Sequence, residues 1–257
     1  MDYIIICLAA LIGSGLTLFS GFGLGTILVP VFAIFFPIEI AIALTAIVHF
    51  LNNLFKLGLL GKKANRNVVL RFGIPSIVAA FGGAYVLTLI TEMQPLFQYT
   101  VFNKTFVVMP VKLTIAILLI VFALFDIVPR LVRLQFDKRY LPLGGILSGF
   151  FGGLSGNQGA LRTAFLIRAG LTKEAFIATG VVIACLIDIS RLTVYSKQII
   201  NIGDRFNFPL IIAATLSAFT GAFIGNKFLK KITISTVQYV VATMLFIFAI
   251  LLGLGII

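Results

Sequence analysis

The sequence predicts an all-α membrane protein with two inverted repeats, each a re-entrant, glycine-broken helical hairpin followed by three transmembrane helices. The prediction rests on composition, on two glycine-rich breaks and on the placement of the basic residues. Of 257 residues, 60% are apolar and 11% are charged, whereas a soluble domain carries about 25% charged residues. A soluble enzyme and a disordered chain are therefore excluded. A nucleic-acid-binding domain is also excluded, despite the net charge of +12, because the basic residues do not cluster on one polar face.

The first apolar segment is too long for one straight transmembrane helix. Residues 3–38 carry no charge, and as a helix they would extend about 54 Å against a hydrocarbon core of about 30 Å. The motif Ser20-Gly21-Phe22-Gly23-Leu24-Gly25 interrupts this segment, since each glycine disfavours helix by about 1 kcal/mol relative to alanine. We therefore predict helices over residues 4–19, 26–36, 39–60, 72–91 and 112–128.

The same pattern starts again in the second half of the chain. Residues 140–161 are uncharged and run into a second break at 152–159, Gly-Gly-Leu-Ser-Gly-Asn-Gln-Gly. A short helix to about Ile167 and helices over 173–196, 206–228 and 234–256 are predicted to follow. At a constant offset, Ser20 aligns with Ser155, Glu39 with Glu174, Asn53 with Asp188 and Lys56 with Arg191. Residues 1–257 thus form a single transmembrane domain, with repeat one at 1–128 and repeat two at 139–257.

The basic residues distinguish a parallel from an inverted repeat, because short loops rich in Lys and Arg face the cytoplasm. If each broken segment crossed the membrane, ten basic residues would lie inside and seven outside, which is a weak bias. If each is a hairpin that returns to its starting side, the split is thirteen to four, and three crossings per half invert the second repeat. The inner residues are then Lys62, Lys63, Arg66, Arg71, Arg130, Arg133, Lys138, Arg139, Arg168, Lys173, Lys227, Lys230 and Lys231, and the outer ones are Lys104, Lys112, Lys197 and Arg205. Inverted repeats with broken helices are typical of secondary transporters.

Two further stretches have structural interpretations. Residues 92–111 have no counterpart in the second half and are rich in aromatic side chains. They are expected to form an interfacial aromatic belt, with a lid over the transport pathway as the alternative. Gly82-Gly83 and the aligned Gly221 are expected to be helix-packing contacts, since small residues let transmembrane helices approach closely.

Polar side chains inside a bilayer are costly, so each one at membrane depth needs a function or a partner. Spacings of three and four residues place four of them on one face of the predicted helix 39–60: His49, Asn52, Asn53 and Lys56. Asp188 and Arg191 occupy equivalent positions in the second repeat. We expect these faces to converge with the breaks near the midplane. The breaks add the remaining candidate substrate-binding residues: Gly21, Gly23, Ser155, Gly156, Asn157, Gln158 and, one turn later, Arg162.

The charges at depth predict an anionic substrate. Lys56, Arg162 and Arg191 outweigh Asp188, and the helices that return after each break direct their positive N-terminal ends to the same region. Structural alternatives stay open. Lys56 would snorkel to the headgroups, Asp188 and Arg191 would neutralise each other, Asn52 would join two helices, and Arg162 would bind a lipid phosphate.

His49 is the only histidine, and it is either a proton-coupling residue or a hydrogen-bonded structural side chain. A less favoured function is an intramembrane serine protease, since Gly153-Leu154-Ser155-Gly156 matches the G-x-S-G of rhomboid-type proteases and His49 would be the base. In rhomboids, however, the histidine follows the serine in sequence. Cys7 and Cys185 have no metal-ligand spacing, and no nucleotide-binding motif is present. We therefore expect no metal and no cofactor.

The first break followed by Pro30, and its echo before Glu174, resembles the glycine-rich start of the sulfite exporter TauE/SafE family, and the resemblance covers essentially the whole chain. It implies export of a small sulfur-containing or carboxylate anion, such as sulfite, a sulfonate or sulfoacetate, across the bacterial inner membrane. The second break departs from a plain glycine run at Asn157 and Gln158, and no second-half proline matches Pro30. The two breaks are therefore not chemically equivalent.

Together these observations predict a multi-pass secondary transporter of the cell inner membrane. It would export a small anion, such as a sulfur oxyanion, a sulfonate or a small carboxylate, by alternating access. An anion channel of the same architecture is the main alternative. The expected partners are the anionic substrate and membrane lipid, not nucleic acid, and a homo-oligomer stays an open alternative.

Overall fold

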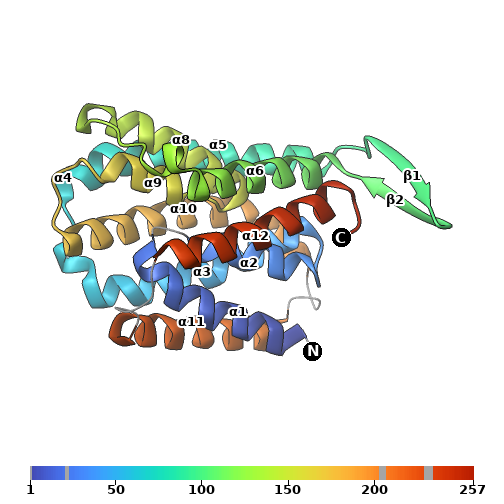
Figure 1. Ribbon diagram of the computed structural model, residues 1–257, viewed down its shortest axis with the longest axis horizontal. Helices are drawn as coiled ribbons and strands as arrows, with labels where there is room; N and C mark the ends of the chain where they lie inside the picture. Colours follow the sequence, from blue (N-terminus) through green and yellow to red (C-terminus); the bar gives the residue numbers. More distant parts are fainter. Residues whose placement is uncertain (1, 21–22, 203–206, 229–233) are drawn as a thin grey trace.

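The computed structural model describes residues 2–20, 23–202, 207–228 and 234–257, most of which are helical (Figure 1). The first half contains α1 (Asp2–Ser20), α2 (Leu24–Ala33), α3 (Ile38–Leu60), α4 (Arg66–Val68), α5 (Ile74–Thr91), α6 (Pro110–Ile127) and α7 (Pro129–Val132). The second half contains α8 (Leu141–Ser155), α9 (Gly159–Leu166), α10 (Lys173–Ile202), α11 (Phe208–Phe228) and α12 (Ile234–Gly253). The predicted helices are all found, with shifts at their ends.

Three short turns lie between these helices: η1 (Gly61–Lys63), η2 (Val69–Gly73) and η3 (Lys138–Tyr140). The second of them is π-helical and leads directly into α5. Pro75, in the first turn of α5, has no N–H to donate to the carbonyl of Arg71, and a wider turn accommodates the missing bond.

The all-α prediction needs one correction, because part of residues 92–111 forms a β-hairpin. Strands β1 (Phe97–Val101) and β2 (Lys104–Val108) pair antiparallel. Aromatic and β-branched side chains dominate both strands, and these residue types favour a pleated surface. Phe102 and Asn103 form the turn with φ of 48° and 59°, as a two-residue hairpin with positive φ at both positions requires.

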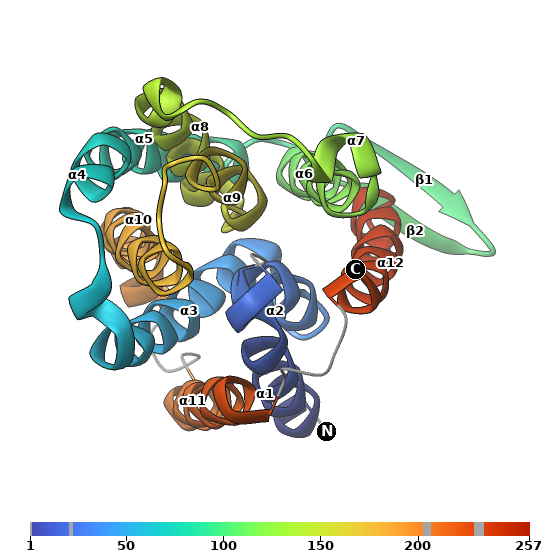
Figure 2. The ribbon, with the colours of Figure 1, turned by 60° about the vertical axis from the view of Figure 1, so that its left-hand side comes forward.

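The hairpin projects beyond the helices in both views (Figures 1 and 2). Tyr99 ties it to the end of the chain, since its hydroxyl donates to the carbonyl of Leu254 at 2.7 Å. The side chain of Phe102 at the tip is 97% exposed. The expected aromatic belt stays a prediction, now placed on two strands.

Each predicted break separates two antiparallel helices. α2 returns to the end of the molecule where α1 begins, and α9 returns to the opposite end, where α8 begins (Figure 1). The first break lies between Ser20 and Leu24, and the second between Ser155 and Gly159. Every residue of α2 is buried, so this ten-residue helix is enclosed by protein along its whole length.

Helices of the two halves pack against each other in matching pairs. α1 packs on α11 and α8 packs on α5, while α3 packs on α10 and α6 on α12. In the predicted repeat, α1 aligns with α8, α3 with α10, α5 with α11 and α6 with α12. When each helix is replaced by its aligned counterpart, the pair α1–α11 becomes the pair α8–α5. The pairs α3–α10 and α6–α12 become themselves. The packing therefore has the symmetry that the predicted repeat would require.

Glycine brings α8 into backbone contact with α5. A Cβ atom added at each of three glycines one turn apart would lie 2.2 to 2.3 Å from a carbonyl oxygen of the η2–α5 segment. The pairs are Gly145 with Phe72, Gly149 with Ser76 and Gly153 with Ala80. A spacing of four residues between small side chains is a recurrent way of packing membrane helices closely.

The aligned glycines have the predicted packing role. A Cβ at Gly83 would lie 2.0 Å from the carbonyl oxygen of Phe150, and one at Gly221 would lie 2.0 Å from that of Leu11. A Cβ at Gly82, by contrast, would meet no atom within 4 Å. The prediction is confirmed for Gly83 and Gly221 and is wrong for Gly82, which faces outward.

Five helical segments within the described ranges are long and apolar enough to cross a membrane: Ile38–Gly58, Arg66–Thr91, Pro110–Ile127, Lys173–Ser196 and Phe208–Gly225. The chain is thus a predominantly helical membrane protein. Some residues that the sequence analysis used lie outside the described part of the chain, either entirely or in their side chains: Ser20, Gly21, Lys197, Arg205, Lys227, Lys230 and Lys231.

Candidate functional site

The polar face of α3 is buried inside the protein. His49, Asn52, Asn53 and Lys56 all lie among the buried polar residues, and α3 packs on α2, α10 and α11. Lys56 is 6% exposed, so protein covers it and it does not extend to the outer surface. Asn52 accepts a hydrogen bond from Ser14 of α1 at 3.1 Å, which makes it the interhelical contact that was one of its two expected roles.

Asp188 and Arg191 form a fully buried ion pair one turn apart on α10. Both side chains are 0% exposed. Arg191 Nε donates to Asp188 Oδ1 at 3.0 Å, and Arg191 Nη2 lies 2.8 Å from the same oxygen. The neutralising interaction expected as an alternative is therefore present, and it uses only one of the two carboxylate oxygens.

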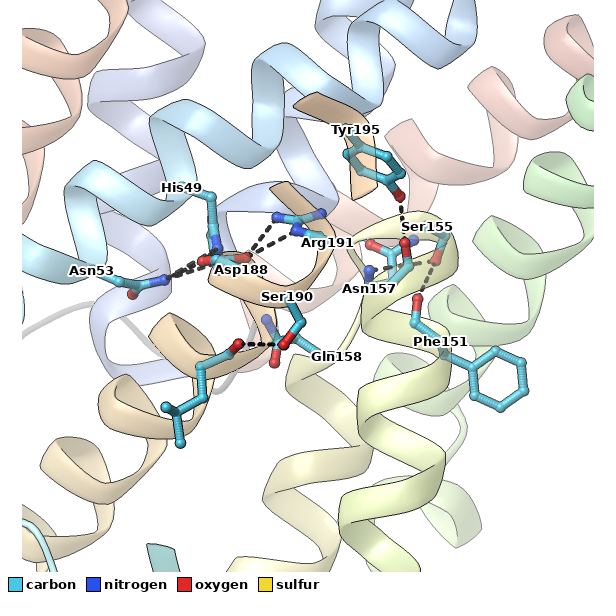
Figure 3. Close-up of polar contacts among 12 residues, drawn as sticks. His49, Asn53, Phe151, Ser155, Asn157, Gln158, Asp188, Ser190, Arg191 and Tyr195 are labelled. Carbon is cyan, nitrogen blue, oxygen red and sulfur yellow. Dashed lines mark hydrogen bonds and ion pairs between the residues drawn. The ribbon is translucent and has the colours of Figure 1, made fainter. Parts of the chain in front are cut away.

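The other oxygen of Asp188 connects α10 to α3. His49 Nδ1 lies 2.6 Å from Asp188 Oδ2, and Asn53 Nδ2 donates to the same oxygen at 3.3 Å. Figure 3 shows both α3 side chains directed at the carboxylate from one side and Arg191 reaching it from the other. A buried carboxylate needs such compensation, because an unpaired charge in a low-dielectric interior is very costly.

The second break contributes a left-handed residue and two buried amides. Gly156 ends α8 with φ of 80°, a conformation that is strained for residues with a Cβ. Ser155 donates from its hydroxyl to the Phe151 carbonyl at 3.1 Å and accepts from the backbone N–H of Asn157 at 3.4 Å. Gln158 precedes α9 and accepts from Arg162 Nη1 at 3.2 Å. Arg162 is only half-buried, whereas Asn157 and Gln158 are buried.

The two breaks meet. A Cβ at Gly25, in the first turn of α2, would lie 3.2 Å from the carbonyl oxygen of Gly156. A Cβ at Gly156 would lie 2.7 Å from Arg191 Nη1, and one at Gly23 would lie 3.7 Å from His49 Nε2. The backbone of each break is therefore in contact with the charged cluster of α3 and α10.

Several polar atoms at this meeting point have no hydrogen-bond partner among the described residues. They are both side-chain atoms of Asn157, Gln158 Nε2, Arg191 Nη1 and Thr45 Oγ1. Buried polar groups in native proteins are nearly always paired, so a group of unpaired ones needs an explanation. These atoms are mostly donors, the kind of group that a bound oxyanion would satisfy.

Two residues of this region escaped the sequence analysis. Thr45 lies one turn before His49, and its Cγ2 would be 3.7 Å from a Cβ at Gly25. Tyr195 lies one turn after Arg191 and donates from its hydroxyl to the carbonyl of Gly153 (Figure 3). Both extend the predicted polar faces by one helical turn. Their spacing of four residues from His49 and Arg191 is the signal in the sequence that could have identified them.

The geometry gives no support to a serine protease. Ser155 is bonded to its own helix and His49 to Asp188, and no hydrogen bond joins Ser155 to His49 within the ranges that the structure describes. A catalytic serine needs its base within hydrogen-bond reach.

Comparisons with known proteins identify the family of the chain. The family model of the sulfite exporter TauE/SafE matches residues 5–252, which include both breaks and the buried cluster. Comparisons with curated proteins and with solved structures find no match. The chain therefore belongs to the sulfite exporter TauE/SafE family, which is a family of membrane transporters and not of enzymes.

Proposed function

We propose that this chain is a secondary transporter that exports a small anion across the cell inner membrane by alternating access. The substrate class is a sulfur oxyanion, a sulfonate or a small carboxylate. The observation that carries the proposal is the contact between the two breaks, Gly25 against Gly156, beside a buried cluster with unpaired donors. Transporters bind their substrates where discontinuous helices of two repeats meet.

The arrangement of the helices supports two inverted repeats, 1–128 and 139–257. The hairpin α1–α2 starts from one end of the molecule and the hairpin α8–α9 from the other (Figure 1). The matched pairs α1–α11 and α8–α5 fit a two-fold exchange of the halves. In this proposal each hairpin enters the bilayer and returns to its own side.

The orientation of the chain in the membrane follows from its basic loops. The connections after α3, α7 and α9 lie at one end of the molecule (Figure 1). They carry the basic residues Lys62, Lys63, Arg133, Lys138, Arg139 and Arg168, whereas the β-hairpin at the opposite end carries only Lys104. Basic loops face the cytoplasm, so we place the hairpin α8–α9 on the cytoplasmic side and α1–α2 on the outer side.

Asn157, Gln158 and Arg162 are the proposed ligands. Asn53, Lys56, Asp188 and Arg191 are proposed to surround the bound anion together with Gly23, Ser155 and Gly156. The cations Lys56, Arg162 and Arg191 exceed the single carboxylate Asp188. An anion would balance this excess and satisfy donors that have no partner among the described residues. The N-terminal ends of α2 and α9 add backbone N–H groups and a positive helix dipole.

Purified protein in liposomes tests the proposal. Uptake of radiolabelled sulfite, thiosulfate, methanesulfonate and small carboxylates should saturate with concentration for at least one anion. Asn157→Leu removes two unpaired polar atoms at similar volume and should lower this flux at least tenfold, and Arg162→Ala should weaken it too. Arg130→Ala, at an exposed position of α7, is the matched control and should transport normally. Flux that rises linearly with concentration would instead favour the anion channel, and no flux for any anion would contradict the proposal.

A further inference from the structure

His49 is the only histidine of the chain, and its contacts define which ring nitrogen carries the hydrogen. Asp188 is compensated by Arg191 at Oδ1, so it is ionised and can only accept hydrogen bonds. His49 Nδ1, at 2.6 Å from Oδ2, must therefore carry the hydrogen. In the neutral ring the lone pair is then on Nε2. This nitrogen lies 3.3 Å from Asn53 Nδ2 and 3.7 Å from the Cβ position of Gly23 in the first break.

We infer that His49 Nε2 is a proton-binding site and that the proton and the transported anion bind together. The inference rests on the proposed function and deepens it, because it names the coupling ion. Neutral His49, Asp188 and Arg191 sum to zero charge. Protonation of Nε2 adds a positive charge in the buried cluster, while Nδ1 keeps its bond to Asp188. Intramembrane histidine and carboxylate pairs are suited to this role, since imidazole changes charge near neutral pH.

The surrounding charges make the two binding events cooperative. Apart from Asp188, the charged groups close to this cluster are Arg191 on α10, Lys56 on α3 itself and Arg162 on α9. Glu39 on α3 and Lys173 and Glu174 on α10 lie at the starts of their helices, away from the cluster. The titratable side chains Cys185 and Tyr195 also lie on α10, α2 has no charged residue, and α11 has none among its described side chains. Three cations thus face one carboxylate. Their repulsion disfavours protonation of His49 until an anion binds. Because such coupling is reciprocal, an anion that favours protonation of His49 is bound more tightly when His49 is protonated.

Coupling of this sign is symport. A monovalent anion that crosses with one proton moves no net charge, so its flux follows the anion and pH gradients and not the membrane potential. Net export then occurs when the outward gradient of the anion exceeds the inward gradient of protons. An anion that crossed alone would be driven outward by the potential, and this difference separates the two mechanisms.

Binding measurements test the inference with methanesulfonate, which stays ionised at all pH values used. The full chain, purified with a tag that contains no histidine, is titrated by calorimetry in two buffers of different ionisation enthalpy. We expect net proton uptake of up to one per anion, and an affinity that falls by about tenfold per pH unit once His49 is neutral. His49→Gln should bind without proton uptake and with an affinity independent of pH. Glu174→Gln, at an exposed site on α10, should behave like the unmodified protein.

A second measurement uses the unmodified protein, so it does not require any variant to fold. Because the chain has one histidine, the imidazole of histidine-labelled protein gives a single NMR signal. Its titration midpoint should differ between anion-free and methanesulfonate-saturated protein. Binding without proton uptake, proton uptake that persists in His49→Gln, or an unchanged midpoint would overturn proton coupling and leave anion transport standing. If neither methanesulfonate nor any other anion tested binds, the proposed function fails, and the coupling fails with it.

Discussion

Arg191 Nη1 lies 2.7 Å from the point that a Cβ atom on Gly156 would occupy. The second break thus has room for a buried guanidinium only because residue 156 has no side chain. This contact joins the positive charge of α10 to the backbone that connects α8 with α9, at the centre of the proposed anion site.

Gly156→Ala is therefore expected to disturb anion binding. The added methyl group would push the guanidinium away, and the left-handed backbone would become strained by about 1 to 2 kcal/mol. Gly170→Ala is the matched control, since Gly170 also has a left-handed φ, of 73°, but open space around its Cβ position. Both variants should lose similar stability from strain, and only Gly156→Ala should lose methanesulfonate affinity by calorimetry. Equal loss of affinity in both would contradict the assigned role of the contact.

The neighbouring glycines of α5 offer an internal comparison of packing. Gly83→Ala should strongly destabilise the protein, because its methyl group would lie 2.0 Å from the carbonyl oxygen of Phe150 and force α5 away from α8. Gly82→Ala meets no atom and should be neutral or slightly stabilising, as alanine favours helix by about 1 kcal/mol over glycine. The thermal unfolding midpoint in detergent measures both. Similar midpoints for the two variants would argue against the close approach of the helices.

Removal of both members of the buried ion pair should cost less than the sum of the two single removals. Asp188→Ala leaves the charge of Arg191 unpaired and is expected to cost about 3 to 5 kcal/mol. The double variant Asp188→Ala/Arg191→Met should lose less than the two single variants together, since residues in contact are not additive. A double-mutant cycle of unfolding free energies gives the coupling. Glu92→Ala, at an exposed site, should stay within about 0.5 kcal/mol of the unmodified protein. Additive losses at positions 188 and 191 would show that the pair contributes nothing.

Cysteine accessibility tests the inverted arrangement. In a variant that lacks Cys7 and Cys185, single cysteines at Tyr3 and Phe35 should react with a membrane-impermeant reagent from the same side of the membrane. Cysteines at exposed Lys62 and Lys138 should react only from the other side. If Tyr3 and Phe35 label from different sides, the first hairpin crosses the bilayer, and the inverted repeat is wrong.

The helices and both breaks were predictable because they depend on local properties. An uncharged stretch limits how long a membrane helix can be, and clustered glycines mark where it ends. The β-hairpin was missed for the opposite reason, since its aromatic side chains were interpreted by composition and not by their alternation along the strand. Phe102 and Asn103 also lack the glycine that usually marks such a turn.

The polar helix faces that form the site were predictable, but the contacts between their side chains were not. Helical spacing placed His49 and Asp188 on polar faces, yet the bond between them joins residues far apart in sequence and depends on how α3 packs on α10. The difference in burial between the two arginines was not predictable for the same reason. Arg162 is half-buried and bonded to Gln158, whereas Arg191 is fully buried at the contact between the breaks.

The backbone contacts made by glycine also determine which parts of the molecule can move as rigid units. α8 is held against α5, and α11 against α1, without intervening side chains that could slide or change rotamer. Each unit therefore combines the first helix of one half of the chain with a later helix of the other half. A rocking motion that opens the site to either side of the membrane would separate these two mixed units, and it would not separate the N-terminal half of the chain from the C-terminal half.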